Sequence, residues 1–266
     1  MNKTLLQIKN LTKSFGGLVA VNDLSFSVEE KSIHALIGPN GSGKTTTLNM
    51  IAGELMPDSG SVLYQDQDLV KSKPHLISRM GLSRKFQNIR LFSGMTALEN
   101  IMIGIHRNYP SHIVDFIVNI SKAKKEELII KEKAIEILNF LGLYRIKDEK
   151  VENLAYGNQK VLELGRALIS NPKLILLDEP AAGLNPSERA DFVNLLKQIN
   201  NNGITLLLIE HNMDVVMDIS NTITVLNFGK KIAEAGPKEI QNDDSVIDAY
   251  LGSSYRKKKE QGEVDA

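Results

Sequence analysis

The feature that most constrains this chain is a glycine-rich loop between an apolar segment and a segment that favours a helix. The loop has the sequence GPNGSGKT and fits the pattern G-x-x-x-x-G-K-[ST]. Its glycines tolerate positive φ angles, so consecutive backbone N–H groups can turn inward around an anion. We predict a phosphate-binding loop with these residues: Gly38, Pro39, Asn40, Gly41, Ser42, Gly43, Lys44, Thr45 and, at the start of the helix, Thr46.

Two side chains of this loop have chemistry that suits a nucleotide. The Lys44 ammonium can reach the β- and γ-phosphates, and the Thr45 hydroxyl is the expected ligand of Mg²⁺. A helix that begins near Gly43 would direct its positive N-terminal end at the same anion. The alternative is an ordinary glycine-rich turn, which the strand before the loop and the helix after it make the weaker interpretation.

Length and composition exclude several classes of protein. The 266 residues suffice for one large domain or for a domain with a substantial insertion. The formal net charge of zero argues against a protein built mainly to coat nucleic acid, and the lack of cysteine excludes disulfides and thiolate chemistry. The sequence contains neither a signal peptide nor an apolar segment long enough to span a membrane. We therefore expect a soluble cytoplasmic protein.

The apolar patterns predict an α/β fold. We expect a P-loop NTPase with an N-terminal antiparallel β subdomain, a mostly parallel core sheet and an inserted α-helical subdomain at about 89–159. The helical prediction depends on the charged, amphipathic segment 122–141 and on the capping pattern at Thr96 and Glu99. The ATPase domain would occupy residues 1–252 and be followed by a charged tail at 253–266.

Two carboxylates follow the clearest buried strand. Four consecutive apolar residues precede Asp178 and Glu179, and another continuous apolar strand leads to His211. Because parallel strands deliver their C-terminal ends to one edge, we expect both strands to lie next to the phosphate-loop strand. Asp178 then suits a contact to Mg²⁺, direct or through water. Glu179 is the candidate for orienting or deprotonating an attacking water, and His211 for a hydrogen bond to that water or the γ-phosphate.

Structural alternatives exist for these side chains. An Asp-Glu pair after a strand is usually a helix cap or a surface pair, and a histidine there is usually structural. Their coincidence with an intact phosphate loop favours function. For Phe15, position alone favours an ordinary strand aromatic over a platform that stacks on a base. We expect His34 in the core. Side chains expected at the surface are His75, His106 and His112, together with Lys122, Lys124 and Lys125, for which a nucleic-acid or lipid patch is the minor alternative.

Together these motifs resemble the ATP-binding subunits of ABC transporters over nearly the whole chain. Gln87 falls where that family has a glutamine that links the nucleotide site to the membrane partner, and the resemblance gives it a catalytic and metal-binding role. His211 matches the switch histidine, and Phe15 matches the adenine-stacking position, which reverses the interpretation from position alone. The place of the LSGGQ signature, which contacts the ATP of a partner subunit, is taken by Leu154, Ala155, Tyr156, Gly157 and Asn158.

The signature departs from its common form. Ala155 replaces serine, Tyr156 replaces glycine and Asn158 replaces glutamine. Loss of the serine hydroxyl removes one expected γ-phosphate contact and leaves Gly157 with backbone N–H groups at the next helix N-terminus. The same LAYG segment, with DEPAAGLNP, IEHNMDVVM, FQNIRLF and DAYLG, is similar to one subfamily, the branched-chain amino acid importers. The ATPases of urea importers have similar motifs and remain an alternative.

The resemblance implies partners and ligands. It implies ATP and Mg²⁺ at a head-to-tail pair of ATPase subunits, the second one identical or related. Two transmembrane permease subunits would hold the pair at the inner face of the cell membrane, with an extracytoplasmic solute-binding protein as an indirect partner and no nucleic acid. Two other hypotheses stay open. An ABC ATPase that acts on nucleic acid or ribosomes usually has two cassettes or a coiled-coil insertion, and a phosphate-loop kinase would need an acceptor site.

Overall fold

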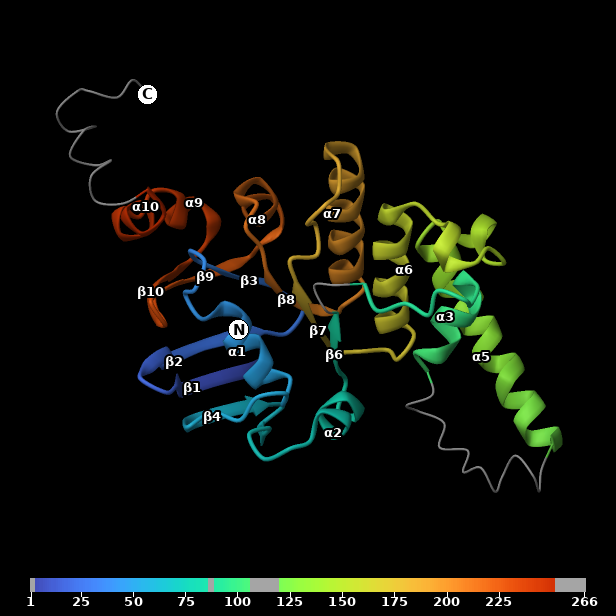
Figure 1. Ribbon diagram of the computed structural model, residues 1–266, viewed down its shortest axis with the longest axis horizontal. Helices are drawn as coiled ribbons and strands as arrows, with labels where there is room; N and C mark the ends of the chain where they lie inside the picture. Colours follow the sequence, from blue (N-terminus) through green and yellow to red (C-terminus); the bar gives the residue numbers. More distant parts are fainter. Residues whose placement is uncertain (1–2, 86–88, 106–119, 252–266) are drawn as a thin grey trace.

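The computed structural model describes residues 3–85, 89–105 and 120–251, without the side chains of residues 120–123 and 251 (Figure 1). The strands are β1 (Thr4–Phe15), β2 (Leu18–Glu29), β3 (Ile33–Ile37), β4 (Ser59–Tyr64), β5 (Gln67–Asp68), β6 (Leu82–Lys85), β7 (Leu174–Asp178), β8 (Thr205–Ile209), β9 (Thr222–Asn227) and β10 (Lys230–Ala235). The helices are α1 (Lys44–Ile51), α2 (Pro74–Arg79), α3 (Ala97–Ile103), α5 (Ile120–Phe140), η1 (Tyr144–Ile146), η2 (Val151–Asn153), α6 (Tyr156–Leu168), α7 (Pro186–Asn201), α8 (Met213–Ile219), α9 (Pro237–Gln241) and α10 (Asp244–Leu251).

The N-terminal sheet is antiparallel, with the strand order β2-β1-β4-β5. A tight turn joins β1 to β2, and Gly16 takes a φ of 57° there, a conformation that glycine adopts without a side-chain penalty. The turn pairs Phe15 with Leu18 across the hairpin. The predicted antiparallel part is therefore confirmed, and it brings the aromatic end of β1 beside the start of β2.

The core sheet has the order β10-β9-β3-β8-β7-β6, and only β10 is antiparallel to its neighbour. The prediction that the strand ending at Asp178 lies next to the phosphate-loop strand is wrong. Strand β8 lies between β3 and β7, while Asp178 pairs with Ile209 so that β7 and β8 end at the same level. Every residue of β3, β7 and β8 is buried, so apolar pattern alone does not distinguish their order.

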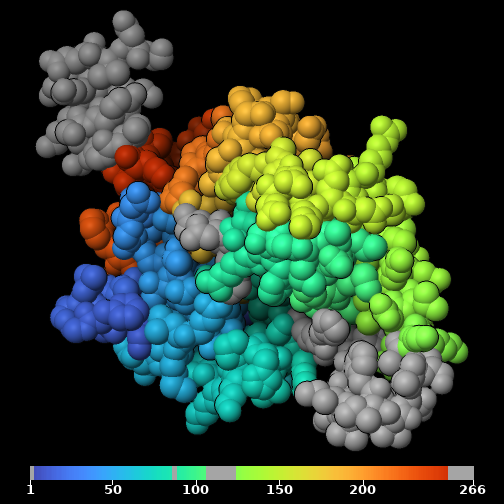
Figure 2. Space-filling view, turned by 45° about the vertical axis from the view of Figure 1, so that its right-hand side comes forward, coloured from blue at the N-terminus to red at the C-terminus, as the bar shows by residue number. Residues whose placement is uncertain are grey.

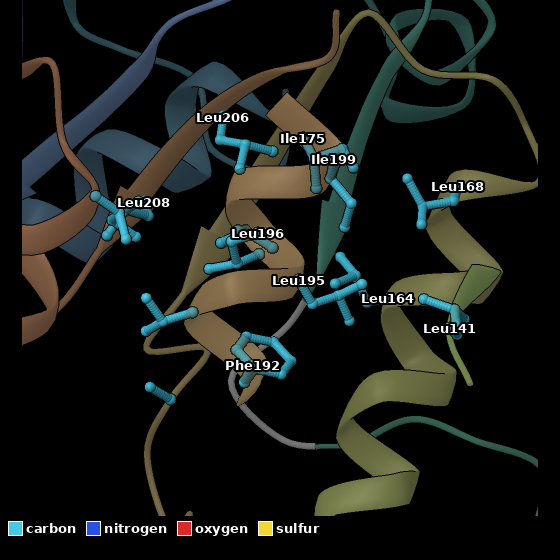
Figure 3. Packing of buried hydrophobic residues seen from close by; sticks show 14 of the residues in the cluster. Leu141, Leu164, Leu168, Ile175, Phe192, Leu195, Leu196, Ile199, Leu206 and Leu208 are labelled. Carbon is cyan, nitrogen blue, oxygen red and sulfur yellow. The ribbon is translucent and has the colours of Figure 1, made fainter. Parts of the chain in front are cut away.

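The two faces of the core sheet have different covers. One face packs against α1 and the N-terminal sheet, in a cluster that includes Leu36 from β3 and Leu48 from α1. The other face packs against α7, α8 and the helical region, and Figure 3 shows α7 side chains such as Leu196 between the strands and α6. The parallel strands are therefore covered on both sides, which explains their continuous apolar sequences.

Helices fill the described chain between β6 and β7. Helix α3 begins with the predicted capping box, in which Thr96 accepts from the Glu99 N–H and Glu99 accepts from the Thr96 N–H. It contacts α5 and α6, and in Figure 2 these green to yellow-green residues gather on one side of the molecule. Residues 113–119 and the tail 253–266 lie outside the described residues. Within the described part, no helix combines the length and apolarity needed to cross a bilayer.

His34 is a buried core residue, as predicted, and its Nε2 atom lies 2.9 Å from Thr224 Oγ1. Burial, with a smaller effect of the Lys231 charge, lowers the pKa of His34 from 6.5 to about 4. An unfolded chain therefore binds this proton at a higher pH than the folded chain does. The stabilisation is complete above pH 6.5 and is lost as pH falls toward 4.

We expect this histidine to cause a loss of about 2 kcal/mol in the free energy of unfolding between pH 7.5 and pH 5. Urea unfolding at both pH values measures it. The His34→Gln variant should lack this part of the pH dependence, whereas His75→Gln, at an exposed position, should retain it. An equal pH dependence in the parental chain and His34→Gln would contradict the assignment.

Candidate nucleotide-binding site

The phosphate loop connects β3 to α1 through glycines that no other residue can replace without strain. Gly38, Gly41 and Gly43 have φ angles of 148°, 80° and 100°. A Cβ atom on Gly38 would lie 2.1 Å from the Leu226 carbonyl oxygen, and one on Gly43 would lie 2.4 Å from that of Ala20. The loop is therefore fitted tightly between β9 and β2 and opens toward solvent where α1 begins.

Lys44 is the first residue of α1, and its side chain is folded back over the loop. Its Nζ atom donates hydrogen bonds to the carbonyl oxygens of Gly38 at 2.8 Å and Pro39 at 2.9 Å. Burial lowers the pKa of Lys44, and the carboxylates of Glu179 and Asp178 act against that decrease. An anion that enters the loop would meet this ammonium together with the free N–H groups of the helix start.

A pocket of about 350 Å³ lies over the loop. Its lining comes from the phosphate loop, the first hairpin and two strand ends: Phe15, Leu18, Ala20, Asn40, Gly41, Ser42, Gly43, Lys44, Thr45, Thr46, Glu179 and His211. The structure therefore brings Phe15, Glu179 and His211 to the predicted loop. The sequence analysis missed Leu18 and Ala20. The Gly16-Gly17 turn was the signal for them, because a tight hairpin there must place the start of β2 beside Phe15.

Glu179 and His211 are in direct contact at the edge of the pocket. His211 Nε2 lies 2.7 Å from Glu179 Oε1. Glu179 has a φ of 45°, a strained value for a residue with a side chain, and its N–H donates to the Ile209 carbonyl. Glu210, which the sequence analysis also missed, accepts from the N–H groups of Ala181 at 2.8 Å and His211 at 3.2 Å. It therefore holds the two loops together.

Asp178 lies behind the pocket rather than in its lining. Its side chain is buried, Arg84 Nη2 lies 3.7 Å from its Oδ2 atom, and burial raises its pKa. Among the described residues, its Oδ1 atom is buried without a hydrogen-bond partner. A divalent cation would supply the missing partner and favour the ionised carboxylate. Asp178 and Thr45, an exposed residue of the pocket lining, therefore have oxygen atoms of the kind that Mg²⁺ binds, usually through one or two carboxylates plus substrate phosphates.

The signature residues are not brought to this pocket. Leu154 and Ala155 precede α6, and Tyr156, Gly157 and Asn158 form its first turn. Strands β8 and β7 lie between α1 and α6 in Figure 1. Gly157 and Asn158 instead line a separate pocket of about 390 Å³ beside α7. The phosphate loop and the signature of one chain therefore lie at two separate pockets.

Other predicted residues fall at the surface or outside the described chain. Gln87, His106 and His112 lie outside the described residues, as does the side chain of Lys122. His75, Lys124 and Lys125 are exposed, as expected.

Comparison with protein families identifies the family to which this chain belongs. A model described as "ABC transporter" matches residues 21–182, from the second strand to the segment after Glu179. The chain belongs to the ABC transporter family. A second model, described as "Branched-chain amino acid ATP-binding cassette transporter", matches residues 230–256 of this ABC protein. A relative of similar length is the high-affinity branched-chain amino acid transport ATP-binding protein BraF of Pseudomonas aeruginosa, which is 38% identical over 255 residues and matches over 96% of this chain and 100% of BraF.

Solved structures agree with the ABC fold. The crystal structure of an ATP-binding cassette of an ABC transporter in its ADP conformation has a TM-score of 0.82 and 37% identity, and the match covers 94% of this chain and 100% of that one. A dimeric post-hydrolysis state of another ATP-binding cassette, bound to ADP and Pi, has a TM-score of 0.73 and 25% identity over 88% of this chain and 99% of that one. This ABC protein is therefore an ATP-binding subunit with the cassette fold.

Proposed function

We propose that this chain binds Mg²⁺-ATP in the pocket over the phosphate loop and hydrolyses it to energise a membrane importer. The observation that carries this proposal is the contact of Glu179 with His211 on the wall of the same pocket that contains Lys44. A carboxylate and an imidazole beside a phosphate-binding loop are suited to the handling of a water molecule next to a γ-phosphate.

Each side chain has a distinct role in this proposal. Lys44 exchanges its two carbonyl partners for phosphate oxygens, which are stronger acceptors because they are charged. Glu179 orients the attacking water and takes its proton, while His211 fixes the Glu179 carboxylate through their hydrogen bond. Thr45 and Asp178 would hold Mg²⁺, which neutralises negative charge that develops on the phosphates.

The separation of pocket and signature favours a paired assembly. A second ATPase subunit, identical or related, would place its signature over the nucleotide of this chain. The signature of this chain would in turn lie over the nucleotide of the second subunit. ATP that bridges both subunits only in a closed pair stabilises closure, and hydrolysis removes that bridge. The dimeric state of the cassette bound to ADP and Pi supports the pairing of subunits for a protein of the same fold. In the signature of this chain, Gly157 and the N–H groups at the start of α6 replace the missing serine hydroxyl.

Branched-chain amino acids are the cargo that we propose. The support is that BraF is a branched-chain amino acid transport protein and that residues 230–256 match the family of branched-chain amino acid ATP-binding cassette transporters. The remaining partners would be two permease subunits, which place this chain at the inner face of the membrane, and an extracytoplasmic solute-binding protein. Urea or another small amide is the alternative cargo, because the importers of urea have similar motifs.

Reconstitution tests the transport function. The chain is co-expressed with the permease and second ATPase genes of its own locus, and the complex is purified into liposomes with the cognate binding protein inside. We expect leucine-loaded binding protein to stimulate ATP turnover and urea to have no effect. Stimulation of ATP turnover by urea and not by leucine would identify urea as the cargo. Failure of the chain to co-purify with permeases, with sedimentation on ribosomes instead, would overturn the transport function.

Replacement of Phe15 separates base recognition from phosphate recognition. Its ring is half exposed at the pocket wall, where a purine could stack on it. We expect Phe15→Ala to weaken ATP binding by about fivefold to a hundredfold, because stacking on a base contributes about 1–3 kcal/mol. Binding of inorganic tripolyphosphate, which has no base, should remain unchanged. Equal losses for both ligands in isothermal titration would contradict the stacking role.

A further inference from the structure

A buried lysine connects the signature helix to the loop that carries Glu179. Lys160 lies in the second turn of α6 and has no exposed surface. Its Nζ atom donates a hydrogen bond to the carbonyl oxygen of Pro180 at 3.1 Å. Because Pro180 directly follows Glu179 in the chain, this bond ends one residue away from the carboxylate proposed to act on water.

The buried position of the Lys160 ammonium is energetically costly, so an interaction that only a charged donor makes must compensate for it. Burial, with the repulsion of Lys85, lowers its pKa to about 8, while the charges of Glu210, Glu163 and Glu179 act against that decrease. A methionine would fill similar space without the cost of removing a charge from water. The feature that a methionine could not supply is the charged hydrogen bond to the Pro180 carbonyl.

Tyr156 makes a second contact between the same helix and the same loop. Its ring lies with its centroid 5.5 Å from Lys160 Nζ, at a distance typical of a cation–π contact. The ring also covers Gly183, where an added Cβ would lie 3.0 Å from Tyr156 Cε1. The start of α6 therefore contacts the loop near both of its ends, at Pro180 and at Gly183.

The loop is held from its other side as well. Glu210, at the end of β8, accepts a hydrogen bond from the Ala181 N–H. Lys160 and Glu210, from two different elements, thus bind the carbonyl oxygen and the N–H of one peptide group, the bond between Pro180 and Ala181. The strained backbone of Glu179 lies immediately before this peptide group. A backbone conformation of this kind persists only where its surroundings fix it.

We propose that Lys160 is a positioning residue for Glu179. Lys160 fixes the loop after β7 to α6, the helix that bears the signature. The inference rests on the proposed function, in which Glu179 acts on water. A displacement of α6 then reaches Glu179 through the Pro180 carbonyl. The ATP that a second subunit presents to the signature of this chain would in this way influence hydrolysis in the chain's own pocket.

Substitutions at Lys160 in the assembled transporter test this role. We expect Lys160→Met to lower kcat by about tenfold or more, since a hydrogen bond from a charged donor is lost, with the Kd for ATP within about twofold of the parental value. Lys160→Arg and Lys160→Gln each retain a donor and should restore most of the rate. Lys197→Met is the control, because this partly exposed lysine of α7 pairs with Asp218 and makes no bond to the loop after β7 among the described contacts, and it should behave as the parental chain does.

A double variant shows whether Lys160 acts through Glu179. In a Glu179→Gln background, Lys160→Met should change the residual single-turnover rate by less than about twofold, because the group it positions is already removed. An additional tenfold loss there, a parental kcat for Lys160→Met, or equal losses in Lys160→Met and Lys160→Arg would each overturn the proposal. So would loss of the cooperative melting transition in Lys160→Met and Lys160→Leu, since the lysine would then serve the fold.

The same experiment separates this inference from the proposed function. If Glu179→Gln loses turnover and Lys160→Met does not, only the positioning role fails. If Glu179→Gln keeps the parental turnover, the hydrolytic assignment itself fails and the positioning role fails with it.

Discussion

Replacement of Glu179 by glutamine leaves ATP bound and lowers its turnover by about a hundredfold to ten-thousandfold, the range that general base catalysis contributes. Glutamine keeps the size of the side chain and can still hydrogen-bond to His211, so the pocket retains its shape. It cannot accept a proton from water. The effect should therefore fall on kcat alone, and equilibrium binding of ATP should not change.

Single-turnover hydrolysis in the purified transporter, with ATP binding followed separately, measures this result. Glu239→Gln is the control, because that residue is exposed on α9 and is not part of the pocket lining. Turnover at the parental rate in Glu179→Gln would remove the residue from the mechanism. A loss of binding that parallels the loss of rate would instead mean that the carboxylate shapes the pocket.

Replacement of Lys44 by methionine should abolish useful ATP binding. The ammonium is buried in the loop, and a triphosphate would lose its main charged partner there. Removal of one member of a buried, hydrogen-bonded charge pair costs about 2–5 kcal/mol, which weakens binding by about thirtyfold or more. Methionine preserves the aliphatic stem, so the fold should stay intact.

Titration with ATP and with ADP in the presence of Mg²⁺ tests the Lys44 prediction. The loss should be larger for ATP, because Lys44 reaches the β- and γ-phosphates and ADP has no γ-phosphate. The Lys197→Met chain, with the same substitution at a partly exposed lysine outside the pocket lining, should bind both nucleotides normally. Unchanged ATP affinity in Lys44→Met would refute the phosphate-loop assignment.

The chemistry of the site was predictable from local sequence, whereas its spatial order was not. The phosphate loop and the strand-end carboxylates depend on neighbours in the chain, and the structure brings Glu179 and His211 to the loop. The position of β8 between β3 and β7 depends on the pairing of strands that are equally buried, and nothing in their composition ranks them.

The buried charges were harder still to anticipate. A lysine in an amphipathic helix normally faces water, so Lys160 gave no sign that it would lie inside. Its burial arises from the approach of α6 to the loop after β7, which is a tertiary contact. The same holds for Glu210, whose partners are backbone groups of two loops that only the folded sheet brings together.

The packing of Tyr156 on Gly183 also limits how this protein can be recombined with others. A chimera that receives the common glycine signature at position 156 would lose the aromatic cover of Lys160 and leave a gap above Gly183. Transfer of the signature of this chain into another cassette would place a tyrosine at the position of Tyr156, against whatever side chain that cassette has at the position of Gly183. Residues 156, 160 and 183 should therefore be exchanged between cassettes as one unit.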